Sequence, residues 1–460
     1  MDATSPEKAL SDTGATTPVF VTGSTMRHVL VMTGTGTAGL IAIFIVDLVS
    51  LLYISWLHDP SLTAGVGFAT VVMFFSVSIN VGLMIPIGAL VSRALGARRP
   101  EDARRLATSC SLLMAFLATL VSLATLPLLP WILRMLGASD QTFSVAYSFL
   151  LICLPTNVLM AFGMAFSAVL RAAGDAKRSM YATLSVAAVT VVLDPVLIFG
   201  LDLKTNGAAI TINIARVVYV LVAYRYVTRI HKLLARPRMK DIAADARPFF
   251  AIAVPAILTN IAAPAANAFF TSIMARFGDQ AIAASAIIDR VTPVAFGGLF
   301  ALAGAIGPVL GQNWGAQRYD RMKQTLRDAL NFTIVYVACV WLVLYLVRVP
   351  ITDAFHAQEL TAELVQFFCL LSGFIWFFVG LVFVSNASFN NLGYPLLSTF
   401  FNWGRATLGM IPFAYFGAEM GGPKGALIGI GLGSVAFGIA AIITAFWTIR
   451  RLERQASPPL

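Results

Sequence analysis

The sequence is poor in charge and in cysteine, and each shortage argues against a class of protein. Only 12% of the 460 residues are Asp, Glu, Lys or Arg, about half of the roughly 25% that soluble globular chains carry. The four cysteines are widely spaced and fall within apolar segments, which disfavours a disulfide framework or a metal site. The four histidines are equally scattered (His28, His58, His231 and His356). A membrane enzyme with a catalytic cluster in an extended loop is therefore disfavoured.

Long apolar runs are what the sequence has in abundance. Hydrophobic residues make up 58% of the chain and come in blocks such as 39–57 and 332–347. A helix needs about 20 predominantly apolar residues to span the hydrocarbon core, and its backbone polar groups must bond within the segment. The short alternating strands of a membrane barrel are missing. We therefore expect an all-α polytopic membrane protein with twelve transmembrane helices, near residues 29–57, 63–92, 106–133, 142–170, 180–201, 207–224, 248–275, 281–312, 328–347, 362–390, 395–417 and 425–449.

The two ends of the chain have a different composition. Residues 1–25 are rich in Ser, Thr, Ala and Asp and have no apolar core, so we expect a disordered cytoplasmic tail and not a signal peptide. Residues 451–460 follow the last apolar run, and we expect them to form a second cytoplasmic tail.

The net charge of +10 follows the topology. The loop after the second predicted span and the segment after the sixth hold Arg93, Arg98, Arg99, Arg104, Arg105, Arg225, Arg229, Lys232, Arg236, Arg238, Lys240 and Arg247. The loops of the opposite side hold only Arg134, Lys204, Arg276, Arg348 and Lys424. Because cytoplasmic loops carry the excess of Lys and Arg, this asymmetry predicts a multi-pass protein of the inner (plasma) membrane with both termini in the cytoplasm. The basic charge thus needs no nucleic acid to explain it.

Two stretches of the chain recur at one offset. GALVSRALGARRPEDARR from Gly88 matches GPVLGQNWGAQRYDRMKQ from Gly307, and 307 − 88 = 219. RAAGDAKRS around Gly174 matches NNLGYPLLS around Gly393 at the same offset, since 393 − 174 = 219. Six spans in each repeat is an even number, so we expect two parallel six-helix lobes related by an axis along the membrane normal. The N-terminal lobe would comprise residues 26–229, a cytoplasmic linker 230–246, and the C-terminal lobe 247–450.

The order of these elements resembles the multidrug and toxic compound extrusion (MATE) family from Met26 to Leu452. The matching pieces are SRALGARRPEDARR, LRAAGDAKRSMYAT, LDPVLIFGL, GPVLGQNWGAQRYDR and FNNLGYPLLST. The resemblance implies a secondary antiporter, not an enzyme, that exports small amphipathic and often cationic compounds by alternating access in exchange for protons or sodium ions. We expect a monomer in the lipid bilayer with no cofactor besides that coupling ion.

Two carboxylates lie inside predicted spans of the N-terminal half, Asp47 in the first and Asp194 in the fifth. A carboxylate there costs about 2.5–3.5 kcal/mol on insertion scales, and such a residue is a functional-site hypothesis by default. The alternative for Asp194 is a structural role near the helix end, beside Pro195. The MATE resemblance implies ion-coupling aspartates at both positions. Since the position that matches Asp47 in the second half is Ala266, we expect coupling to reside in the N-terminal half.

Neutral polar residues of the same half are candidates to line the ion or substrate cavity: Asn80, Asn157, Thr190 and Asn213. Interhelical hydrogen bonding is the alternative role for each. Thr190 lies four residues before Asp194 and so on the same helix face. DinF-type members of the family often have an asparagine at the position of Thr190, and this departure favours a proton over sodium as the coupling ion. The seventh and tenth spans lack the acids of the NorM-type branch, so the resemblance is nearer the DinF-type branch.

Two other classes of transporter remain as alternatives. A major facilitator also has two parallel six-helix halves, but its loop motif has an acid before the arginine, where this chain has Ser92. A flippase for lipid-linked sugars, from the wider related superfamily, usually has extra helices and a cationic cavity. The intramembrane cations of this chain are only Arg216, Arg290 and Arg405.

Overall fold

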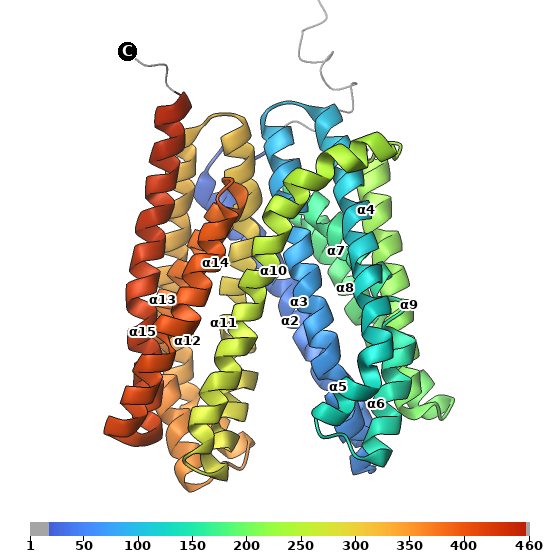
Figure 1. Ribbon diagram of the computed structural model, residues 1–460, viewed down its shortest axis with the longest axis vertical. Coiled ribbons are helices and arrows are strands. Elements are labelled where there is room, and N and C mark those ends of the chain that lie inside the picture. Colours follow the sequence, from blue (N-terminus) through green and yellow to red (C-terminus); the bar gives the residue numbers. More distant parts are fainter. Residues whose placement is uncertain (1–17, 457–460) are drawn as a thin grey trace, which may run out of the picture.

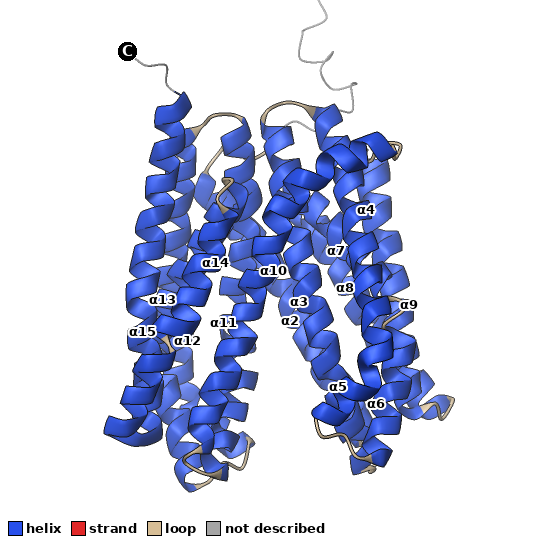
Figure 2. Cartoon of the chain, viewed as in Figure 1, coloured by secondary structure: helices blue, strands red, loops and turns tan. Residues whose placement is uncertain are grey.

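The protein is an all-helical bundle, seen in a computed structural model that describes residues 18–456 (Figures 1 and 2). The first group of helices is α2 (Thr25–Ser55), α3 (Pro60–Gly96), α4 (Pro100–Thr125), α5 (Leu129–Met135), α6 (Asp140–Cys153), α7 (Asn157–Ala172), α8 (Ala176–Pro195) and α9 (Lys204–Arg225). The second is α10 (Met239–Ala275), α11 (Asp279–Gly315), α12 (Tyr319–Ala354), α13 (Glu359–Asn391), α14 (Pro395–Gly404) and α15 (Ile411–Ala456). Short 3₁₀ or π-helical turns extend four of them: Leu126–Leu128, Val196–Gly200, Tyr226–Ile230 and Arg405–Gly409.

Within the described residues, ten helical segments are long and apolar enough to cross a membrane, and α6 and α7, bent by 52°, together form an eleventh. The last of the ten, residues 395–456, has 62 residues and would be roughly 90 Å long if straight, about three times the thickness of the hydrocarbon core. It is interrupted at Gly421 and Gly422, where the φ of 60° at Gly422 suits glycine. A Cβ on Gly425 would lie 1.9 Å from the Gly417 carbonyl oxygen, so the two arms pack against each other as a hairpin. The prediction of twelve transmembrane helices is confirmed.

The sequence repeat is visible in the backbone. Gly174 and Gly393, which end the fourth span and the tenth, have φ values of 87° and 82°. Arg98 and Gln317 end the second and the eighth, with φ values of 55° and 56°. Each pair is separated by the offset of 219 residues, so the two lobes turn their chains in the same way at the same points.

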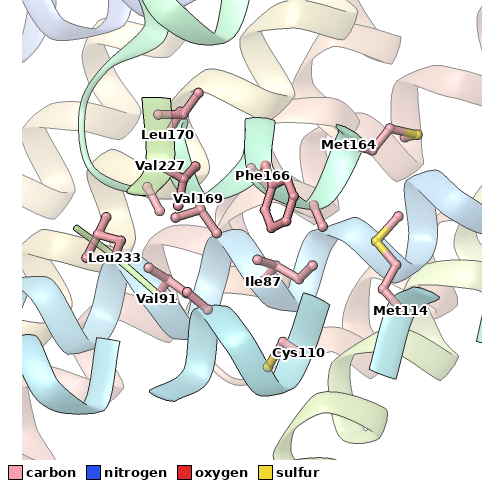
Figure 3. Packing of buried hydrophobic residues seen from close by; sticks show 14 of the residues in the cluster. Ile87, Val91, Cys110, Met114, Met164, Phe166, Val169, Leu170, Val227 and Leu233 are labelled. Atoms are coloured by element: carbon pink, nitrogen blue, oxygen red, sulfur yellow. The ribbon is translucent and has the colours of Figure 1, made fainter. Parts of the chain in front are cut away.

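The core of the N-terminal lobe includes the segment after α9. Figure 3 shows Leu233 beside Val91 of α3 and Val169 of α7, in one cluster of buried apolar side chains. The backbone N–H of Ala235 donates to Thr108 Oγ1 at 2.9 Å. Helix α10 already begins at Met239, so the second half of the expected 230–246 linker is helical, and the first half is bound to the N-terminal lobe.

Residues 18–24, the N-terminal segment, lie between the lobes at the end of the bundle where the described residues begin and end, which we call the terminal end (Figure 1). Phe20 is 2% exposed and packs against α2, α8 and α11. Its N–H donates to Gln312 Oε1 at 2.9 Å, and its carbonyl oxygen accepts from Asn313 at 3.2 Å and Arg321 at 2.8 Å. The prediction of a disordered tail is wrong for residues 18–25, because Phe20 fills a buried apolar site. Residues 1–17 and 457–460 lie outside the described residues.

Helices α3 and α11 bring the two lobes into backbone contact near the terminal end. A Cβ on Gly96 would lie 2.0 Å from the Gln312 carbonyl oxygen, and one on Gly315 would lie 2.1 Å from that of Arg93. The Gln312 side chain also donates to Ala172 O at 2.7 Å. Figure 1 shows the two groups of helices further apart at the opposite end. The two lobes are therefore in close backbone contact near the terminal end and separate toward the opposite end.

Candidate functional site in the N-terminal lobe

Asp194 lies at the end of α8, where the chain enters the π-helical turn Val196–Gly200. Its side chain is 1% exposed, and Oδ2 accepts a hydrogen bond from the Ser50 hydroxyl of α2. The Thr211 hydroxyl is close to the same carboxylate but donates to Gly207 O at 3.2 Å. Oδ1 has no hydrogen-bond partner among residues 18–456. An unsatisfied buried acceptor costs about 1–3 kcal/mol, so a proton or cation on this oxygen would be stabilised.

Asp47 lies one helical turn before Ser50 on α2, and so on the same side of the helix. Its side chain is exposed and has no hydrogen-bond or ion-pair partner in the described part of the chain. Helix α2 packs directly against α8, and Ser50, one turn after Asp47, is the residue that contacts Asp194.

Two of the predicted amides meet in the interior of the lobe. Asn80 Nδ2 donates to Asn157 Oδ1 at 2.9 Å, and Asn157 Nδ2 donates to the Ser122 hydroxyl at 3.2 Å. These three residues come from α3, α7 and α4, and all are at most 2% exposed. Asn80 Oδ1 is buried without a partner among the described residues. The arrangement fixes three helices to each other and leaves one free acceptor.

The break between α6 and α7 forms a second polar group, which contains the predicted Asn213. Asn213 accepts from the Thr156 hydroxyl at 2.6 Å and donates to Ile152 O at 2.9 Å. Arg216, one turn along α9, donates to Thr156 Oγ1 at 2.7 Å and to Cys153 O at 2.5 Å. The break leaves the Cys153 carbonyl oxygen free to accept a hydrogen bond from Arg216. The arginine therefore has a structural role at the break.

Thr190 is the predicted residue that the structure does not join to another helix. Its hydroxyl donates to Val186 O of its own helix at 3.0 Å. It is 7% exposed and lies one turn before Asp194.

Sequence reasoning missed Ser50, Thr156 and the partners of Arg216. The spacing of three residues places Ser50 on the same side of the helix as Asp47, but gives no sign of its contact with Asp194 on another helix. Pro155 inside an expected span was the signal for the break at Thr156, because proline removes a backbone donor and kinks a helix.

A polar group outside the spans fixes the end of the N-terminal lobe. Asp175 accepts from His231 Nε2 at 2.8 Å and pairs with Arg178. Partial burial raises the pKa of the Asp175 carboxyl, but the hydrogen bonds from His231 and Arg178 outweigh it and lower that pKa to about 2. The carboxylate therefore stays ionised at neutral pH and ties the start of α8 to the segment after α9.

Comparison with known proteins places the chain in a family. A family model described as MatE matches residues 37–196 and 255–416, and the two matches begin 255 − 37 = 218 residues apart. The FAD transporter of Shewanella oneidensis is 26% identical over 91% of this chain and 94% of its own length. The multidrug export protein MepA of Staphylococcus aureus is 24% identical over 74% of this chain and 77% of its own. The bent form of the Vibrio cholerae MATE transporter VcmN shares the fold, with a TM-score of 0.88 at 24% identity over 93% of this chain and 98% of that one. Because the family model matches both halves, the chain belongs to the MatE family of membrane transporters.

Proposed function

We propose that the protein is a cation-coupled antiporter that exports amphipathic organic compounds across the inner membrane by alternating access. The observation that supports it best is Asp194, a buried carboxylate with one donor from another helix and one oxygen without a partner. The proton is the proposed coupling ion and sodium the alternative. Asp47 and Asp194 bind it, and Asn80, Asn157, Thr190 and Asn213 line the ion or substrate cavity.

The coupling step follows from the Ser50–Asp194 hydrogen bond. While Asp194 is ionised, it holds α2 against α8. A cation on the free Oδ1 weakens this acceptor and loosens the contact. Helix α2 also packs against α11 of the other lobe, so a shift of α2 would reach the contact between the lobes.

The orientation in the membrane is part of the proposal. The terminal end carries Arg98, Arg99 and Arg318, and the positive-inside rule assigns such loops to the cytoplasm. The N-terminal lobe (26–229) and C-terminal lobe (247–450) would then rock about the closed cytoplasmic contact. The chain acts as a monomer and is nearer the DinF-type branch of the family.

The proposed substrates are small amphipathic organic compounds. One relative is named for FAD and another for multidrug export, so amphipathic compounds of either charge are candidates. A flippase of lipid-linked compounds is the alternative.

The decisive experiment measures efflux of ethidium from proteoliposomes, with proton and sodium gradients imposed separately. We expect the proton gradient to drive transport and Asp47→Asn to abolish it. Asp289→Asn is the matched control, because Asp289 is an exposed intramembrane carboxylate of the other lobe. Exchange at the normal rate in Asp47→Asn would exclude Asp47 as a coupling residue. Transport driven only by the sodium gradient would show that sodium, and not the proton, is the coupling ion.

A further inference from the structure

Arg405 is an intramembrane cation without a partner. It is the first residue of the π-helical turn Arg405–Gly409, between α14 and α15 in the C-terminal lobe. In the described part of the chain it has no hydrogen bond, ion pair or ring contact, and its Nε is buried. Arg216 in the other lobe, by contrast, is satisfied by Cys153 and Thr156. Because an unpaired buried charge is strongly unfavourable, a residue of this kind marks a ligand site.

The side chain of Arg405 faces the interior of the lobe. Leu396, Phe400 and Leu408 are between 64% and 71% exposed and mark the outer side of this segment. Ser398 and Asn402, seven and three residues before Arg405, are at most 6% exposed and share its side of the helix. Arg405 is thus directed inward and not toward lipid.

The register between α13 and α14 gives the depth of Arg405. Ser398 donates to Asn390 Oδ1 at 2.9 Å, and Asn402 donates to Asn386 Oδ1 at 2.8 Å. Each step of four residues forward on α14 therefore corresponds to four residues back on α13. Three residues beyond Asn402, directly after α14, is Arg405, and three residues before Asn386 on α13 is Phe383. The two therefore lie at the same depth.

Phe383 belongs to an aromatic cluster of α11 and α13. Its ring centroid lies 5.2 Å from that of Phe300 and 6.5 Å from that of Trp376, which stacks on Phe296 at 4.6 Å. Phe300 is 40% exposed, although α11 packs against helices of both lobes. The lobe therefore has an exposed ring, Phe300, in contact with Phe383, which the register places at the depth of Arg405.

We propose that the C-terminal lobe binds an anionic aromatic compound, with its phosphate or carboxylate on Arg405 and its ring against Phe300 and Phe383. The inference deepens the proposed transport function by naming a substrate class. A guanidinium donates two parallel hydrogen bonds to a phosphate or carboxylate and stacks on aromatic faces, so it suits both parts of such a compound. A lipid headgroup carries the same phosphate chemistry and is the second source of this ligand.

The test uses two fluorescent probes that share a ring and differ in one phosphate, flavin mononucleotide and riboflavin. Binding is measured by fluorescence quenching with the purified full chain in neutral detergent and no ion gradient. We expect wild type to bind the mononucleotide more tightly than riboflavin. Arg405→Gln should weaken mononucleotide binding about 30-fold and leave riboflavin unchanged, while Arg405→Lys retains part of the preference.

Thermal unfolding of the same variants separates binding from folding. Because Arg405 has no partner to lose, Arg405→Gln without ligand should unfold at or above the wild-type temperature. A lowered temperature, or no phosphate-dependent preference in wild type, would overturn the proposal. If short-chain phosphatidylglycerol displaces the mononucleotide only when Arg405 is present, the headgroup is the physiological source. Failure of the antiport proposal would leave these gradient-free measurements intact, so the two are distinguishable.

Discussion

The two lobes have the same backbone frame but place different intramembrane charges at matching positions. Both turn at matched positions, Arg98 and Gln317 among them, and both contribute a glycine to the contact near the terminal end. The N-terminal lobe holds Asp47 and Asp194, whereas the C-terminal lobe has Ala266 opposite the first and places the unpartnered Arg405 in its interior. A duplicated frame therefore constrains where helices begin, end and touch, and leaves the buried charges free to diverge.

The largest expected effect is on proton-coupled efflux, through the carboxylate of Asp194 in the N-terminal lobe. Asp194→Asn keeps the shape of the side chain but cannot be ionised, so we expect proton-coupled efflux to be lost. Ser50→Ala should reduce the rate less, because the carboxylate remains. Asn386→Asp, which adds a carboxylate to the C-terminal lobe in the Asp194→Asn background, should not restore exchange. Restored exchange there would show that the lobes are chemically interchangeable.

The next largest effect is on stability, at the contact to which each lobe contributes one glycine. Gly96→Ala and Gly315→Ala each place a Cβ about 2 Å from a backbone oxygen of the other lobe. Overpacking of this kind costs about 1–3 kcal/mol, and the two variants should lower the unfolding temperature equally. Gly304→Ala is the control, because nothing lies within 4 Å of its Cβ. Unequal shifts would show that the contact is not symmetric.

A smaller effect tests a polar contact that is present in one lobe only, since Tyr394 occupies the position matching Asp175. The pKa of Asp175 is lowered from 3.8 to about 2, so its ionised form stabilises the fold above about pH 4, and that contribution is lost as the pH falls toward 2. The full shift corresponds to about 2.4 kcal/mol, and solvent screening through Arg178, whose side chain is 40% exposed, reduces it to about 1 kcal/mol. Asp175→Asn should therefore unfold earlier than wild type at pH 7 and converge with it near pH 2. A constant difference across that range would contradict the assignment.

The smallest effect is expected at Thr190. Its hydroxyl donates to Val186 O of its own helix, so Thr190→Val should change stability by less than about 0.5 kcal/mol and, at this edge of the proposed cavity, lower the efflux rate only slightly. Asn157→Val provides the contrast, because it removes a buried link between α3, α4 and α7. Loss of efflux in Thr190→Val would instead place this residue in the ion site.

The sequence predicted the twelve spans and the parallel repeat because both depend on local composition and on a constant offset. It also located both aspartates, since a charge in an apolar run is visible without a structure. Ser50 as the donor to Asp194 was not predictable, because that contact depends on how α2 and α8 rotate against each other. The break at Thr156 was missed because apolar residues continue through it. The absence of any partner for Arg405 is a property of the packed lobe and leaves no trace in one sequence.

The N-terminal segment also has a consequence for biosynthesis. Phe20 leaves the ribosome before Arg321, which binds its carbonyl oxygen and follows 301 residues later. At about 5–20 residues per second, this delay is roughly 15–60 s. The contact near the terminal end is therefore completed only after α11 and the start of α12 have been inserted, so Phe20 reaches its final place long after the helix that follows it has been made.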